Sequence, residues 1–134
     1  MVRRRVKQST TQFLNVDLDV DATSDLQPLV NAFGKKVIVL HAGRIRRRYA
    51  IHLELARVTK TADATIRGFC ALIESLSKAG RDLWNGAKVR EFNIGVQAGT
   101  QPHCCEFALA VETLKAASEL GARIVFTVYA AEES

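Results

Sequence analysis

Residues 13–20 read FLNVDLDV, an alternation of apolar and polar residues that decides how the rest of the chain must be arranged. Leu14, Val16, Leu18 and Val20 fall on one face, and the polar residues between them fall on the other. Side chains alternate across a strand with a period of two, so the pattern predicts a β-strand with one wet face. Such a strand needs neighbouring strands beside it and helices over its apolar face.

Three segments have the apolar spacing of helices. The first is predicted between Ser24, which opens a capping box, and Gly34, which can end a helix. The second is an amphipathic helix from about Ala62 to about Gly80, and the third ends at Gly121.

Turn residues and alternation place the other strands. The turn Ala42-Gly43 is predicted to separate residues 37–40 from a strand that ends near Leu55. Residues 92–96 and 124–128 alternate in the same way and are predicted strands.

The segment between residue 96 and the third helix admits two interpretations. Residues 105–109 alternate after the loop Gly99 to His103, which predicts a hairpin over residues 90–109 with Cys105 pointing inward. An uninterrupted helix that starts at Cys104 remains the alternative, because the alanines here permit it.

The predicted order of elements is βαββ, α, ββαβ. It indicates an α+β fold in a single domain, with a mixed or antiparallel sheet covered on one face by about three helices. We expect this domain at residues 11–131, a flexible basic arm at residues 1–10 and a tail at residues 132–134. The chain of 134 residues is long enough for one hydrophobic core.

Several of these segments carry a resemblance. Residues 92–95 (FNIG), residues 107–109, the helix end at residues 119–122 and the last strand up to Tyr129 resemble the C-terminal half of a bacterial family, domain-of-unknown-function family 4279. The opening strand, the first helix and the glycine turn extend the resemblance to the N-terminal half. It implies a small α+β domain with no established activity or ligand.

Composition limits the classes of protein. Hydrophobic residues make up 48% and charged residues 25%, as in a globular protein, and no apolar run approaches the roughly 18 residues of a membrane span. The basic start is followed by Gln8, Ser9 and Thr10, where a secretory signal would need an apolar core. Three cysteines without framework spacing favour the reducing cytoplasm.

Charge is segregated along the chain. The net charge is +5, and two stretches without any acid carry ten of the nineteen basic residues: Arg3, Arg4, Arg5, Lys7, Lys35, Lys36, Arg44, Arg46, Arg47 and Arg48. A basic end of this kind attracts polyanions and acidic protein surfaces.

The candidate binding residues are predicted to share the polar face of the second hairpin strand: Arg44, Arg46, Arg48 and His52. An equally supported alternative is that the arginines pair with Asp17, Asp19 and Glu54 across an open sheet face.

Signatures of metal binding and catalysis fail. The acidic residues from Asp17 to Asp25 begin like a calcium loop, but Ala22 and Pro28 occupy its two diagnostic positions. No spacing typical of zinc is present, so no metal or other cofactor is expected. Cys104 beside His103 becomes a candidate nucleophile only if a helix starts there, and no catalytic residue is assigned.

The sequence therefore predicts a binding domain that is not an enzyme. It is expected to contact a partner protein through its sheet face or sheet edges, and the basic charge favours an acidic partner. A homo-oligomer is also compatible, and no membrane partner is expected. The alternative is a nucleic-acid accessory protein that uses the basic arm and the hairpin, with weak binding because only Tyr129 could stack on a base. The second alternative is a small cysteine-dependent enzyme centred on Cys104.

Overall fold

The computed structural model describes residues 9–131. Its elements, in chain order, are β1 Gln12–Ala22, α1 Gln27–Phe33, the short 3-10 helix η1 Gly34–Lys36, β2 Val37–Ile45, β3 Arg48–Leu55, α2 Ala62–Glu74, α3 Lys78–Asn85, β4 Val89–Gln97, α4 Val111–Glu119 and β5 Arg123–Tyr129. The predicted tail and most of the predicted arm, residues 1–8, lie outside the described residues. Within residues 9–131, none of the helices has the length and apolar character needed to cross a membrane.

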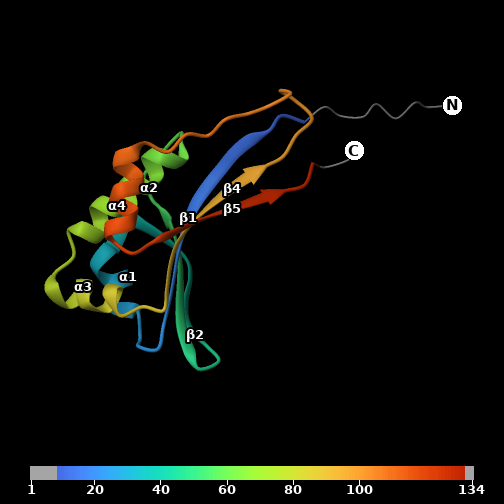
Figure 1. The fold of residues 1–134 in the computed structure, drawn as a ribbon. Coiled ribbons are helices and arrows are strands. Elements are labelled where there is room, and N and C mark those ends of the chain that lie inside the picture. Colours follow the sequence, from blue (N-terminus) through green and yellow to red (C-terminus); the bar gives the residue numbers. More distant parts are fainter. Residues whose placement is uncertain (1–8, 132–134) are drawn as a thin grey trace.

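The strands form one five-stranded sheet in the order β2-β3-β1-β4-β5. All neighbouring pairs are antiparallel except β4 and β5, which are parallel and are joined through α4. Figure 1 shows the helices gathered on one side of this sheet. The predicted α+β class, with a mixed sheet covered on one face, is confirmed.

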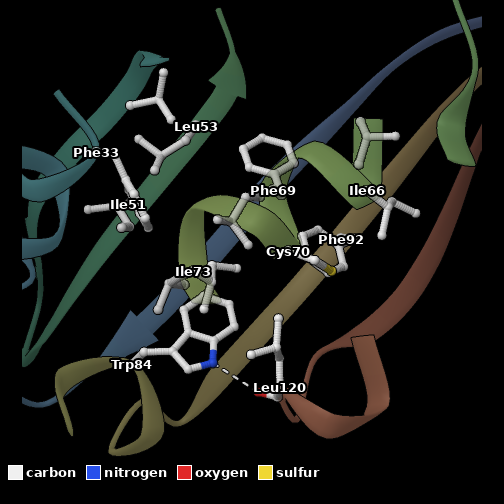
Figure 2. Close-up of a cluster of buried hydrophobic side chains, with 14 of the residues drawn as sticks. Phe33, Ile51, Leu53, Ile66, Phe69, Cys70, Ile73, Trp84, Phe92 and Leu120 are labelled. Atoms are coloured by element: carbon white, nitrogen blue, oxygen red, sulfur yellow. Dashed lines mark hydrogen bonds between the residues drawn. The ribbon is translucent and has the colours of Figure 1, made fainter. Parts of the chain in front are cut away.

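The core lies between β1 and the helix layer. Val16, Leu18 and Val20 are buried on the helix side of β1, as the alternation predicts. Phe69 from α2 lies against Phe92 from β4, with ring centroids 5.8 Å apart (Figure 2). Fully burying a large apolar side chain contributes about 1.5–3 kcal/mol, so this cluster is what holds the helices on the sheet.

Trp84 closes the core at the end of α3. Its side chain is fully buried, and its indole N–H donates to the carbonyl of Leu120, 2.9 Å away (Figure 2). Buried polar groups need such a partner, and this bond joins α3 to the end of α4.

The prediction of one helix from about Ala62 to Gly80 is wrong, because two helices occupy this region. The hydroxyl of Thr61 accepts from the backbone N–H of Ala64 and begins α2, which ends at Glu74. The hydroxyl of Ser77 then accepts from the N–H of Gly80 and begins α3. Each serine or threonine satisfies an N–H that a helix start leaves unpaired, so the second cap starts a new helix.

The hairpin between β2 and β3 turns at Arg46-Arg47, and the predicted turn at Ala42-Gly43 is wrong. Gly43 lies inside β2, opposite Ala50 of β3. Arg46 adopts a positive φ of 57°, a conformation that two-residue hairpin turns require and that glycine or asparagine usually supplies.

Residues 102–110 form neither of the two predicted structures. They contain no strand and no helix, and α4 begins only at Val111. A hairpin partner has no place beside β4, since β1 occupies one of its edges and β5 the other. This segment instead carries the chain across the helix side from β4 to α4, where the N–H of Ala110 donates to Asp63 (2.8 Å).

Ser9 and Thr10, assigned to the flexible arm by the sequence, are held against the end of β4. The carbonyl of Ser9 accepts from the N–H of Thr100 at 2.8 Å. A Cβ at Gly99 would lie 2.4 Å from that carbonyl oxygen, so only glycine allows the two backbones to approach this closely.

Candidate functional site on the open face of the sheet

The side of the sheet opposite the helices carries a cluster of acidic and other polar side chains, and we refer to it as the open face. Residues paired between neighbouring strands lie side by side, so the side chains of this face form rows that run across the strands. One row crosses Glu54, Asp17 and Asn93, on β3, β1 and β4. The next row spans the whole sheet. From β2 to β5 it consists of His41, His52, Asp19, Glu91 and Arg123.

The predicted binding residues do not form one group. Arg48 and His52 lie on the open face, opposite Ile45 and His41 of β2. Arg44 pairs with Tyr49 on the helix side, and its guanidinium carbon lies 5.8 Å from the centre of the Tyr49 ring. The turn explains this difference.

Because two residues of the arginine run form the turn, the arginines before and after the turn point to opposite faces of the sheet. Arg46 and Arg47 are turn residues, so the alternation of β2 ends at Ile45 and that of β3 starts at Arg48. A single strand running through residues 44–48 would have placed Arg44, Arg46 and Arg48 together, as the sequence predicted.

The predicted pairing of arginines with Asp17, Asp19 and Glu54 is also wrong. Arg48 pairs with Asp21 instead, at 3.3 Å. Between β5, an edge strand, and β4, Nη2 of Arg123 lies 2.7 Å from Oε1 of Glu91. Glu91 and Asp21 therefore each have an arginine partner, whereas no ion pair involves Asp17, Asp19 or Glu54 among the described residues.

The central carboxylates make no ion pair with any described residue. The side-chain amide of Asn15 donates to Asp17 and to Glu54, both at 3.0 Å, and holds these two acids near each other. One neutral amide satisfies part of their hydrogen-bonding capacity but none of their charge.

The closeness of these carboxylates, together with their partial burial, changes their pKa values. Partial burial, followed by the neighbouring charges of Asp19 and Glu54, raises the pKa of Asp17 to about 6. Burial also raises the pKa of Asp19, and Glu91 adds to this rise while His52 opposes it. Two acids with raised pKa values therefore occupy adjacent positions on one face of β1, and among the described residues only His52 acts against these rises.

A hollow of about 630 Å³ lies on the open face next to the hairpin turn. Ala50 and Val89 are among its lining residues, and their short side chains leave space between the longer ones. Asp19, Asp21 and Glu91 line one part of it. The rim is formed by the arginines of the turn and the start of β3, namely Arg46, Arg47 and Arg48.

The cysteines lie away from this face. Cys104 and Cys105 are both exposed in the irregular segment, so the prediction that Cys105 points into the core is wrong. Cys70 is buried on the core side of α2, as its helical spacing predicts, and burial followed by Glu74 raises the pKa of its thiol to about 11. Because α4 begins at Val111, no helix start acts on Cys104, and that condition for a reactive thiolate is missing.

The sequence placed Asn15 on the polar face of its strand, but sequence reasoning missed Asp21, Glu91 and Asn93 as members of this face. Glu91 and Asn93 occupy the polar positions in the alternation of residues 90–96, so their side of a strand was predictable. Their place beside Asp17 and Asp19 depends on strand order, which local periodicity does not contain. Within residues 9–131, no group of three or more histidine, cysteine, aspartate or glutamate side chains is arranged to hold a metal ion.

No family model, curated protein or solved structure matches this chain. The resemblance to family 4279 remains a prediction.

Proposed function

We propose that this chain is a protein-interaction domain whose open face receives a basic segment of a partner protein. One observation carries the proposal: Asp17, Asp19 and Glu54 stand together, partly buried and without an ion pair among the described residues. A lysine or arginine placed over them would relieve their mutual repulsion and gain charge-assisted hydrogen bonds.

The arrangement of the face supports a segment and not a single ion. Carboxylates follow the central strand β1 over the rows of Asp17, Asp19 and Asp21, and residues two apart on a strand lie roughly 6–7 Å from each other. An extended basic peptide repeats its side chains with the same period. The hollow beside Asp19 and Asp21 gives room for one long side chain.

The same charges argue against the acidic partner that the basic residue count suggested. An acidic segment on this face would meet Asp17, Asp19 and Glu54 as like charges, which costs binding free energy. The positive charge of the turn, at Arg46 and Arg47, lies at the rim of the hollow, where it can set the direction in which a basic segment docks.

The two alternatives from the sequence receive less support. A phosphate backbone that contacts Arg48 would approach the carboxylates beside it, and Arg44 points to the opposite side of the sheet. Cys104 has no helix start next to it to lower the pKa of its thiol. We therefore propose binding, not catalysis, and place the protein in the cytoplasm because its three cysteines are free.

Capture from native lysate, with and without nuclease, tests the proposal. We compare the wild type with two double variants that change net charge equally: D17N/D19N on the open face and E112Q/E119Q on α4, on the helix side. The proposal expects a partner that survives nuclease treatment, is retained by E112Q/E119Q and is lost with D17N/D19N. A partner that disappears with nuclease, or that both double variants retain equally, would contradict it.

A further inference from the structure

The edge strand β5 exposes apolar side chains and unpaired backbone groups together. It is the last strand of the sheet, and among residues 9–131 no strand pairs with its outer side. The exposed fractions are 54% for Phe126, 61% for Val128 and 54% for Tyr129. Phe126 and Val128 point to the helix side, in line with buried Ile94 and Val96 of β4, yet none of the helices in residues 9–131 covers them.

The other edge of the sheet, β2, is protected in ways that β5 is not. A bulge interrupts β2 between Val39 and His41, and Lys35 and Lys36 precede the strand. Bulges and lysines are the devices by which proteins prevent edge strands from pairing with other chains. Strand β5, with the sequence RIVFTVY, has no bulge, proline, glycine or lysine, and its one charge belongs to Arg123, which is paired with Glu91.

The backbone of β5 shows which groups are free. The carbonyl of Tyr129 accepts from the N–H of Ala98 at 2.9 Å, so it points toward β4. Successive residues of a strand point their N–H and C=O groups to opposite sides. The backbone groups of Ile124, Phe126 and Val128 therefore point outward, and no strand within residues 9–131 pairs with them.

We propose that β5 pairs with β5 of a second copy of this chain, antiparallel and about a twofold axis at Phe126. This register aligns all of β5 with its copy and joins the two sheets into one. The outward N–H and C=O groups of each Phe126 then bond to those of the other, and Ile124 exchanges bonds with Val128 of the second copy.

The side chains fit this self-pairing on both faces. On the helix side, Phe126 meets its own copy, and Ile124 meets Val128, which covers the exposed apolar row. On the open face, Arg123 lies opposite Tyr129, where a cation can stack on an aromatic ring. A partner with a different sequence would have to reproduce these matches, whereas a second copy supplies them by symmetry. The inference concerns the sheet edge and is independent of the proposed function of the open face.

Sedimentation of the full chain under reducing conditions tests the dimer. We expect the wild type to sediment as a dimer at a protein concentration of about 100 μM, which is high enough to populate a weak but specific association. F126K and F126E place like charges opposite each other at the axis, and each should raise the dimer dissociation constant about tenfold or more. An equimolar mixture of the two variants should restore a dimer, because the charges are then opposite.

Two further variants complete the test. I38K changes a side chain of similar exposure (49%) on the other edge and should leave the dimer unchanged. V128P removes one outward N–H without removing a bond to β4, and it should weaken the dimer even if a charge at position 126 disturbs the fold. A wild type that stays monomeric would overturn the proposal. A dimer that dissociates in I38K but persists in F126K and F126E would also overturn it. A mixture of F126K and F126E that remains monomeric would also overturn it.

Discussion

At the scale of single residues, the most informative group is the Asp17 carboxyl. Its pKa of about 6 arises from partial burial and from two neighbouring acids, and the nearby His52 offsets only part of that cost. The folded protein thus carries an unfavourable charge arrangement at neutral pH that a single amide substitution would remove. Groups of this kind are found where a protein gives up stability for function.

We predict that D17N stabilises the protein at pH 7. The folded pKa of about 6 exceeds the ordinary value of 3.8, so between these values the folded state binds more protons than the unfolded state. Stability therefore falls as pH rises from about 4 to about 6, and the full penalty is present at pH 7. Two pKa units correspond to about 3 kcal/mol, and solvent screening of this half-exposed group reduces the expected gain to about 1 kcal/mol.

Urea unfolding of the wild type and D17N at pH 7 and pH 4 measures this effect. The amide has nearly the shape of the carboxyl and can still accept from Asn15, so packing should not change. The gain should be absent at pH 4, and E106Q, which alters an exposed acid of the irregular segment, should show no such pH dependence. Equal stability of D17N and the wild type at pH 7 would contradict the prediction.

At the scale of elements, the hairpin β2–β3 shows what a sequence pattern can and cannot specify. The alternation of β3 predicts a strand with one polar face, and the structure confirms it at His52 and Glu54. Ala42-Gly43 has the composition of a turn, but the chain turns at Arg46, where no glycine marks the positive φ. Moving the turn by a few residues exchanged the faces of Arg44 and Ile45, because strand period is two.

The hairpin also yields a matched pair of variants, R44A and R48A. Each removes one positive charge, from the helix side and from the open face respectively. R48A releases Asp21 from its ion pair, so the affinity for a basic peptide should rise about two- to threefold, the effect of one exposed charge pair. R44A should leave the affinity unchanged. Isothermal titration with a lysine-rich peptide measures both, and an equal response would show that the open face is not where the peptide binds.

At the scale of the whole molecule, local patterns were enough for the fold class but not for the site. Periodicity in residues 13–20 and in the helices indicates which faces are buried, and these faces have only a few ways to pack. The pattern of residues 105–109 could not by itself exclude a strand there. The place beside β4 is taken by β5, which lies near the end of the chain. Likewise, Glu91 and Asp19 are 72 positions apart in sequence (91 − 19), and only the strand order makes them neighbours.

The strand order also changes the meaning of the overall charge. The chain is basic, with a net charge of +5, but its one uncovered sheet face in residues 9–131 is acidic at the centre. A partner selected from net charge alone would have the wrong sign for this face. The central claim is therefore that the open face binds positive charge.

Titration of the isotope-labelled protein, followed by amide chemical shifts at near-physiological salt, tests this claim most directly. Three probes are compared: a lysine- and arginine-rich peptide, an acidic peptide of equal length and a single-stranded oligonucleotide. We predict that only the basic peptide shifts the amides of β1, β3 and β4 around Asp17 and Asp19. D17N/D19N should weaken this binding about tenfold, as the loss of two charge-assisted contacts would, and E112Q/E119Q should not. Tight binding of the oligonucleotide with no response to the basic peptide, or shifts by the basic peptide that avoid these strands, would contradict the account.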